Sequence, residues 1–445
     1  MQSTPPLSTE PLRFALPPIH RHSMANGTSV YIIPAANEDL VTVTVAMRTG
    51  TRHDVVLGET SVAAQMLSRG TKSRDAAAFA EEVEKRGCSV RSVGDSDACS
   101  IQGSGLMEWF HDILRFSAEC LLEPRFDEVE LDKLRQRLVA DMQVDRVDVE
   151  WLALRACAMR AYDGHPYSLP RNGSPSTLRQ LTVQSLKDAH ARMLAAPRHI
   201  IVAGPVEVDS VMKSLEQTFG SLPTPGMLVE TPRARMRPRT GVVAPKEDAV
   251  QSAFRLAMPC VPFSHPDYAG LQLATNVLGG YTLARLFTVL REEKGYTYGA
   301  YAFSDVRACS AITGIVTSVG NEFTADTMAV IADEVNKLNK ERIDDEEFEN
   351  ARQQLLGSFA RSNETPQQTA SLVWTMIQHE LPLDYFERHI MRIQRFTPED
   401  LLLIQERYLS TSSWVVGIAG KSDIVRPAIE GYVDSVEEWL AEGYE

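Results

Sequence analysis

The sequence predicts an α+β protein of two similar domains, each a mostly antiparallel sheet covered by helices on one face. The chain has 445 residues, which is too long for one hydrophobic core. Each half shows strand patterns, then helical patterns, then strands again. The strands alternate apolar and polar residues, as in LVTVTVAM from Leu40, and this alternation is typical of antiparallel sheets with one buried face.

An internal repeat supports two domains. Three segments of the second half resemble segments of the first at offsets of 217, 215 and 215 residues. The pairs are FDEVELDKLRQRLV from Phe126 with IDDEEFENARQQLL from Ile343, TVQSLKDAHARML from Thr182 with TPEDLLLIQERYL from Thr397, and HIIVAGPVEVDSV from His199 with WVVGIAGKSDIV from Trp414. Since three segments keep nearly one register, a chance resemblance is excluded.

The repeat and the local composition place the domain boundaries. We predict an N-terminal domain over residues 14–220 and a C-terminal domain over residues 242–445. Residues 221–241 contain four prolines and are expected to be a linker. Residues 1–13 are rich in Pro, Ser and Thr and are expected to form an N-terminal arm.

The first domain is expected to begin with two strands and continue with helices, a hairpin, more helices and a last strand. Each early helix is expected to end at a glycine, Gly70 and Gly87. The predicted strands are residues 28–35, 40–47, 88–93, 98–105 and 199–206, and the main predicted helices are residues 59–68, 75–86, 107–122 and 127–146.

Residues 281–303 of the second domain are predicted to form a short amphipathic helix, a glycine stop and a strand. Thr282 is expected to cap the helix, and Gly295 to take the left-handed conformation after it. The strand pattern begins at Tyr296. Apolar residues at i, i+3, i+4 and i+7 form the helical stripe, namely Leu283, Leu286, Phe287 and Leu290.

Arg291 and Tyr298 are predicted to meet at this corner between helix and strand. One interpretation is structural, because an arginine in the last helical turn complements the helix dipole and a tyrosine packs well when half-buried. The other is a functional pair of a cation and a phenol. From these residues alone both interpretations stay open.

The amino-acid composition limits the kinds of partner and the cellular compartment that we expect for this protein. The formal net charge of -14 argues against nucleic acid or an anionic membrane as the main partner, and no apolar run is long enough to cross a bilayer. The first residues lack the pattern of a secretory signal, so a cytoplasmic protein is expected, or a periplasmic one if a signal was removed. The six cysteines form no C-x-x-C motif; Cys88 and Cys99 could pair, but free buried thiols are expected.

The common catalytic motifs are absent from the sequence. No two of the ten histidines are four residues apart, so no helix offers the paired imidazoles of H-E-x-x-H or H-x-x-E-H. His165, in GHPYS, is interpreted as a turn residue. Neither G-x-S-x-G, a Walker loop nor G-x-G-x-x-G is present. The residues alone therefore give no complete catalytic site.

The segment GETSVAAQMLSRGT resembles the zinc helix of the pitrilysin/insulinase family of peptidases with an inverted zinc motif. Gly58, Met66, Leu67, Gly70 and Thr71 match that family's pattern. At the three functional positions, Ser61 and Gln65 stand where the family has its two histidines, and Ala64 where it has the catalytic glutamate. The third zinc ligand falls between Asp141 and Arg146, which offer no convincing match. The resemblance therefore implies no metal and no cofactor in this chain.

The second half is more similar to the family. LARLFTVLREEKGYTYGAYAF resembles the segment whose Arg and Tyr contact substrate, and Arg291 and Tyr298 occupy those positions. The resemblance covers most of the chain and implies a fold like that of the mitochondrial processing peptidase. The alpha subunit of that enzyme has a long glycine-rich loop before this helix, whereas here only Gly279 and Gly280 precede it.

The resemblance implies the non-zinc subunit of a heterodimeric zinc endopeptidase that degrades or processes peptides. A homologous partner subunit would carry the zinc motif and its Zn. Tyr298 would contact the scissile carbonyl oxygen or the oxyanion formed from it, and Arg291 the substrate backbone or the same charge. Two alternatives stay open: a catalytically silent structural or assembly subunit, and a peptide-binding homodimer.

Overall fold

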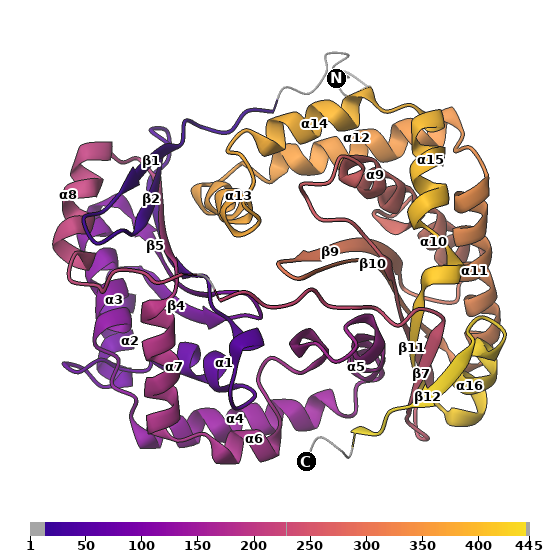
Figure 1. Ribbon diagram of the computed structural model, residues 1–445, viewed down its shortest axis with the longest axis horizontal. Helices are drawn as coiled ribbons and strands as arrows, with labels where there is room; N and C mark the ends of the chain where they lie inside the picture. The colour runs from indigo at the N-terminus through magenta and orange to yellow at the C-terminus, as the bar shows by residue number, and fades with distance from the viewer. Residues whose placement is uncertain (1–13, 228, 442–445) are drawn as a thin grey trace, which may run out of the picture.

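A computed structural model describes residues 14–227 and 229–441, so the predicted arm over residues 1–13 lies outside the described residues. The molecule consists of two halves of similar architecture, each built on a six-stranded sheet (Figure 1). Seven of the ten strand pairs are antiparallel and three are parallel, so the predicted α+β fold with mostly antiparallel sheets is confirmed.

The first sheet has the strand order β1-β2-β6-β3-β5-β4. Only β2 and β6 are parallel among its pairs. Alternate residues of β3 enter the core, as the pattern of LVTVTVAM predicts. The strands are β1 His20–Ser23, β2 Ser29–Pro34, β3 Leu40–Met47, β4 Ser89–Gly94, β5 Cys99–Leu106 and β6 Arg198–Gly204.

The second sheet repeats this order from β7 onward, as β12-β7-β11-β8-β10-β9. Thus β7, β8, β9, β10 and β11 correspond to β2, β3, β4, β5 and β6. The outermost strand differs, because β1 precedes its sheet in the chain and is antiparallel, whereas β12 follows its sheet and is parallel. The strands are β7 Thr240–Pro245, β8 Gln251–Pro259, β9 Ala300–Arg307, β10 Ser310–Gly320, β11 Val415–Gly420 and β12 Ser435–Glu438.

Helices cover both sheets, most of them on the outer face. In the first half they are α1 Glu59–Leu67, α2 Ala76–Glu84, α3 Phe110–Leu122, α4 Glu128–Asp145, α5 Val149–Ala161, α6 Pro175–Gln180, α7 Val183–Ala195 and α8 Val208–Phe219. In the second half they are α9 Tyr268–Gly279, α10 Arg285–Phe287, α11 Thr324–Lys340, α12 Asp345–Arg361, α13 Pro366–Gln378, α14 Tyr385–Arg395, α15 Pro398–Tyr408 and α16 Ser422–Glu430.

The two halves exchange one helix each. Helix α5 of the first half packs on β7, β8 and β11 of the second sheet, and α13 of the second half packs on β3 and β6 of the first (Figure 1). The first helical residues, Val149 and Pro366, are 217 positions apart, which is the spacing of the internal repeat. The inner face of each sheet is therefore partly covered by the other half, which the one-sided layer predicted from the sequence did not include.

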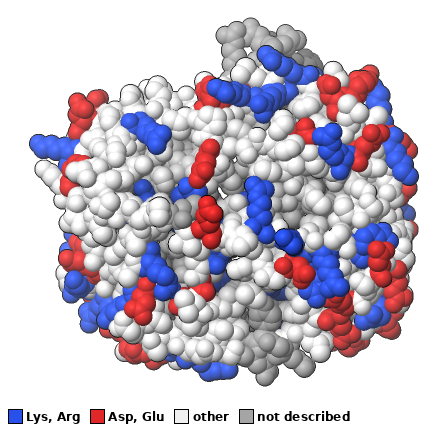
Figure 2. Space-filling view, in the orientation of Figure 1, with Lys and Arg blue, Asp and Glu red and all other residues white. Residues whose placement is uncertain are grey.

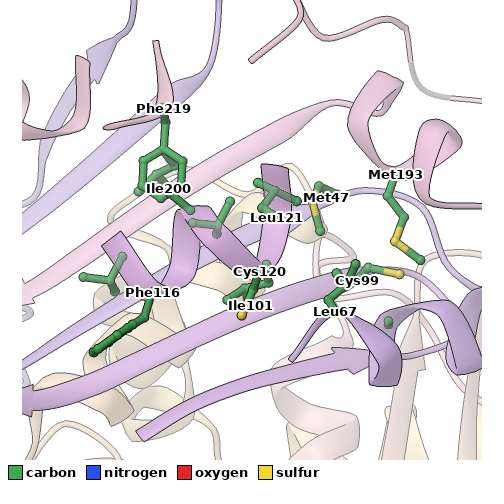
Figure 3. Packing of buried hydrophobic residues seen from close by; sticks show 14 of the residues in the cluster. Met47, Leu67, Cys99, Ile101, Phe116, Cys120, Leu121, Met193, Ile200 and Phe219 are labelled. Carbon is green, nitrogen blue, oxygen red and sulfur yellow. The ribbon is translucent and has the colours of Figure 1, made fainter. Parts of the chain in front are cut away.

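Each half encloses its own hydrophobic core between the sheet and the outer helices. Figure 3 shows part of the first core, where Met47, Cys99, Ile101 and Ile200 from the strands meet Phe116 from α3 and other helix residues. These side chains are essentially inaccessible to water. Burial of a single Leu, Ile or Phe contributes about 1.5–3 kcal/mol, so the cores supply most of the folding energy.

The segment between α8 and β7, residues 220–227 and 229–239 of the described chain, runs along both halves. The amide of Gly226 donates to Ala195 O (2.7 Å) in the first half, and the amide of Ala234 donates to Cys309 O (2.9 Å) in the second. Thr240 and Gly241 already belong to β7. Backbone hydrogen bonds therefore tie this connection to both halves.

Most predicted elements of the first half match the structure within two or three residues, including α1, α2, α4 and β6. All six cysteines are free, and five of them are buried, so Cys88 and Cys99 are not paired. No helix among the described residues is long and apolar enough to cross a membrane.

Candidate functional site

Helix α1, which resembles the zinc helix, carries a polar network in place of metal ligands. The Ser61 hydroxyl donates to Asn172 Oδ1 (2.7 Å), and the Gln65 amide lies 3.4 Å from the same oxygen. The Arg137 guanidinium on α4 donates to Gln65 Oε1 (2.9 Å). Ala64 is fully buried and contributes only a methyl group. Hydroxyl, amide and guanidinium groups therefore satisfy one another on this face of the helix.

These residues do not fit a zinc ion. Zn²⁺ is held by imidazole, thiolate or carboxylate groups, and a guanidinium beside the site repels a cation. Nowhere in residues 14–227 and 229–441 do three His, Cys, Asp or Glu side chains gather in a way that could hold a metal. Asp141 lies one turn after Arg137 on α4, but no second acidic or imidazole ligand from α1 accompanies it.

The segment with Arg291 and Tyr298 differs from the predicted helix and strand. The helix begins after Ala284, not at Thr282, and is the single turn α10 followed by the π-helix η4, Thr288–Glu293. Strand β9 starts only at Ala300. A π-helix often marks a functional position, because the wider turn displaces side chains from the regular helical spacing. Tyr298 therefore lies on a loop before the strand rather than at its first residue.

Arg291 reaches this loop, but it binds the backbone of Tyr298 and not the side chain. Its Nη1 donates to the Tyr298 carbonyl oxygen (2.8 Å), and its guanidinium lies 5.0 Å from the centre of the Phe287 ring. The side chain of Tyr298 is 90% exposed. The structural interpretation of a half-buried, packed Tyr298 is therefore wrong, and its hydroxyl is free to meet a ligand.

The loop that presents Tyr298 is held at both ends. Gly295 adopts the left-handed conformation expected of it, with φ of 69°. The Thr317 hydroxyl on β10 donates to Gly299 O (3.1 Å), and the Thr297 hydroxyl accepts from Gly299 N (3.1 Å). The exposed phenol is thus carried on a backbone whose position is fixed.

Two cavities lie along the inner face of the second sheet. The first, which we call the α5 cavity, has a volume of about 560 Å³ and is lined by α4, α5 and β9, with Asn172 and Asp141 on one side. The second, the Tyr298 cavity, has a volume of about 980 Å³ and includes Arg291 and Tyr298. Arg255 on β8 lines both cavities. Asn172, which binds Ser61, therefore borders the α5 cavity, and the Arg291/Tyr298 loop borders the Tyr298 cavity. The two cavities have Arg255 as a common lining residue.

A buried ionic network closes the inner end of the α5 cavity. The Asp97 carboxylate accepts hydrogen bonds from Arg52 and from the Tyr167 hydroxyl, and from the amide of Ala308 (3.1 Å) in the second half. Arg52, Asp97 and Tyr167 are all buried. Although burial alone lowers it, the pKa of Arg52 is raised overall by Asp97 and Tyr167, so the guanidinium stays charged.

His165, interpreted from the sequence as a turn residue, has that role. Its Nδ1 accepts from the amide of Tyr167 (3.1 Å), and its Nε2 lies 3.1 Å from Pro232 O of the connecting segment. Burial lowers the pKa of the imidazole. The neutral ring therefore joins the Tyr167 turn to the connecting segment and takes no part in a catalytic cluster.

Sequence reasoning missed three residues of this region: Arg137, Asn172 and Arg255. Asn172 is followed by Gly173 in the sequence, which signals a turn but not a contact with α1. Arg255 interrupts the apolar pattern of β8, and that interruption was the one available signal. Figure 2 shows basic and acidic side chains interspersed on the face viewed, without a large area of one sign.

Comparison with known families decides the relationship. The family described as "Insulinase (Peptidase family M16)" matches residues 30–173, and "Peptidase M16 inactive domain" matches residues 180–355. The chain belongs to the M16 peptidase family. Helix α1 lies within the range matched by the insulinase model, and the exposed loop that carries Tyr298 lies within the range matched by the inactive-domain model.

M16 relatives carry names of both active and inactive proteins. The chain is 24% identical over 350 residues to "Uncharacterized zinc protease YmxG" of Bacillus subtilis, covering 78% of this chain and 85% of that protein. It is 21% identical over 347 residues to "Non-peptidase homolog YmxG" of Helicobacter pylori, covering 78% and 80%. Another B. subtilis relative, 19% identical over 262 residues (58% of this chain and 60% of that protein), is named "Probable inactive metalloprotease YmfF".

Solved structures show the same fold. A peptidase M16 inactive domain from Pseudomonas fluorescens has a TM-score of 0.85 and 22% identity, covering 91% of this chain and 98% of that one. A protease from Helicobacter pylori has a TM-score of 0.81 and 18% identity, covering 91% and 100%. The predicted relationship to the insulinase-like peptidases is therefore confirmed for the family and the fold.

Proposed function

We propose that this chain is the non-zinc subunit of a heterodimeric M16 endopeptidase that acts on peptides or unfolded segments. The exposed Tyr298 phenol carries this proposal. The side chain of Tyr298 is exposed and forms part of the lining of the Tyr298 cavity. At the zinc positions of α1, this chain has Ser61, Ala64 and Gln65. A homologous subunit with an intact zinc motif would complete the site.

The residues of this chain then have separate roles. The Tyr298 hydroxyl donates a hydrogen bond to the oxygen of the scissile carbonyl, where negative charge develops during hydrolysis. Arg291 holds the loop through the Tyr298 carbonyl oxygen, and its guanidinium is exposed enough to reach substrate as well. An extended peptide fits an open sheet edge, because β9 is the outermost strand of the second sheet.

Coexpression with a zinc-motif homologue tests the proposal. The mixture should cleave an unstructured peptide faster than the homologue alone. Tyr298→Phe should reduce turnover by about 100-fold or more, because loss of one oxyanion donor costs about 2.7–4 kcal/mol. Assembly measured by size-exclusion chromatography should be unchanged.

Tyr301→Phe is the matched control, since Tyr301 is 42% exposed and lines the same cavity. Its turnover should equal that of the unsubstituted protein. Equal turnover for Tyr298→Phe would remove the catalytic role of Tyr298. A mixture that cleaves no faster than the homologue alone would contradict the heterodimeric peptidase.

A silent structural or assembly subunit is the second candidate. It draws support from the name "Non-peptidase homolog YmxG" and from the fold of a chain in the complex III2 structure from Candida albicans, with a TM-score of 0.74. A peptide-binding homodimer is the third candidate. Size-exclusion chromatography of the chain with and without the zinc-motif homologue separates the two, because only the assembly subunit forms a mixed complex.

A further inference from the structure

Arg255 is a cation on the inner face of the second sheet that has no ion pair or hydrogen bond among the described residues. It lies on β8, opposite Val316 of β10 and Gly417 of β11. Its neighbours on the same face of β8, Ala253 and Ala257, are buried. Because an arginine is long and hydrophilic, this position is unusual for it unless the guanidinium has something to bind.

Among the described residues, no carboxylate lies within ion-pair distance of Arg255 and no group accepts a hydrogen bond from it. Its one close contact is the ring of Phe303, whose centre lies 6.0 Å from the guanidinium carbon. Glu150 is the acidic side chain that shares the Tyr298 cavity, but it accepts a hydrogen bond from the Ser318 hydroxyl (2.9 Å) instead. Arg255 is half-buried, and burial lowers its pKa, although the charge of Glu150 opposes this shift.

Arg307 provides the internal comparison. It also lines the α5 cavity, but its guanidinium pairs with Asp305 (2.7 Å). Although burial opposes it, the contacts of Arg307 raise its pKa. Of these two arginines on the second sheet, Arg307 therefore has a counterion and Arg255 has none among the described residues, and Arg255 borders both cavities.

The packing of α5 keeps Arg255 reachable. Gly417 allows the backbone of α5 to lie against β11, since a Cβ at this position would come within 2.4 Å of Cys157 N. Helix α5 thus covers β7, β8 and β11 and packs against Ile312 of β10, but not against the aromatic residues at the other end of β9. Tyr301 and Phe303 of β9 are both partly exposed on the sheet beside Arg255.

We propose that Arg255 binds a carboxylate of the peptide held in the Tyr298 cavity, and so selects peptides by an acidic group. This inference rests on the function proposed above. A guanidinium forms two parallel hydrogen bonds with a carboxylate, which suits the C-terminal carboxylate of a peptide or the side chain of Asp or Glu. The open aromatic surface beside it suits the rest of a peptide.

Isothermal titration calorimetry with the full chain tests this site and identifies the source of the carboxylate. Four peptides of one unstructured sequence are compared. The first two lack Asp and Glu and end in a free acid or an amide. The other two are amidated and carry one internal Glu or Gln. A carboxylate bound by Arg255 should increase the affinity roughly 10-fold over the neutral match, either at the terminus or at the side chain.

Arg255→Gln should abolish that difference and leave the affinity for the neutral peptides unchanged, and Arg255→Lys should restore part of it. Arg171→Gln is the control, because Arg171 is an exposed arginine that lines the α5 cavity. It should retain the preference. Circular dichroism establishes that each variant is folded.

Each other result overturns the site. Equal affinity for all four peptides, or a preference that survives Arg255→Gln, would overturn the role of Arg255 and leave the proposed peptidase subunit intact. The same loss in Arg171→Gln would assign the preference to the overall charge of the cavity. Binding of none of the four peptides would overturn both this inference and the peptide-binding role.

Discussion

The hairpins β4–β5 and β9–β10 occupy equivalent places in the two sheets, and their tips meet between the two halves. The first tip contributes the Asp97 carboxylate, and the second contributes the amide of Ala308 that binds it. Gln378, at the end of the exchanged helix α13, also approaches Asp97 (3.5 Å). The two tips therefore join the halves at the centre of the molecule, with the first tip contributing a buried carboxylate and the second a backbone amide.

The inner faces of the two sheets differ in the same way. Strand pairing places Thr44 and Ile201 of the first sheet where the second has Arg255 and Gly417. Thr44 and Ile201 are buried, whereas Arg255 borders two cavities. The first inner face has buried side chains at these two positions, although a smaller cavity of about 340 Å³ lies beside Tyr31 and His199. The polar position of the second inner face is consistent with the proposal that peptide binds in the second half.

Removal of Asp97 should have the largest effect on stability. In Asp97→Ala, Arg52 and Tyr167 lose a buried acceptor and a buried positive charge is left uncompensated. Loss of one member of such a pair costs about 3–5 kcal/mol of the free energy of unfolding. Denaturant unfolding should show this loss, and the control Asp95→Asn, at an exposed position of the same tip, should change stability little. If Asp97→Ala were as stable as the control, the tips would not be a joint between the halves.

Gly417→Ala should destabilise the protein by about 1–3 kcal/mol, since overpacking typically costs this much. The new Cβ would come within 2.4 Å of Cys157 N and 2.6 Å of Ala153 O, and these backbone atoms of α5 have little freedom to move. At Gly431, an added Cβ meets nothing within 4 Å, so Gly431→Ala serves as the control. Thermal unfolding of both variants measures the difference. Equal stability would show that the second sheet does not need the close approach of α5.

Local patterns were sufficient to predict much of the fold. The apolar alternation of β3 and the charged N-cap and apolar stripe of α4 depend on neighbouring residues, so both elements were found near their true ends. The internal repeat predicted two copies of one domain, because it is found by comparing the two halves of the chain with each other. It did not predict the exchange of α5 and α13, since a helix pattern specifies an apolar face but not which sheet covers it.

The candidate site was less predictable. The family pattern identified Arg291 and Tyr298, but the spacing suggested contact between side chains, and the structure shows Arg291 on the backbone of Tyr298. The π-helix shifts this register, and a regular helical period cannot represent it. The surroundings of Arg255 are formed by strands β10 and β11 and helix α5. These elements are distant from Arg255 in the sequence, so its position beside two cavities could not be predicted.

A third difference between the inner faces makes stability depend on pH. His199 of β6 pairs with Ala46, and by strand pairing the equivalent position of β11 is Val415, opposite Ala257, one residue after the alignment of the sequence repeat. Within the described part of the chain, neither ring nitrogen of His199 has a hydrogen-bond partner. Burial, together with Arg48 and Arg21, lowers its pKa to about 4. The ordinary pKa of histidine is 6.5. Between pH 6.5 and about 4, His199 is therefore protonated in the unfolded chain and neutral in the folded protein.

His199→Val should therefore flatten the dependence of the free energy of unfolding on pH. In the unsubstituted protein, the contribution of His199 is complete above pH 6.5 and is lost as the pH falls toward about 4, with a slope of at most about 1.4 kcal/mol per pH unit. In the variant, the slope should decrease by the contribution of the one proton that His199 binds. The contribution of His389 should remain, because burial also lowers the pKa of His389 to about 4. Urea titrations at pH 4.5, 5.5 and 6.5 (on the order of one pH unit apart) measure the slope. An unchanged slope in His199→Val would mean that the first inner face admits the charged imidazole, and that the two faces are closer in polarity than their residues indicate.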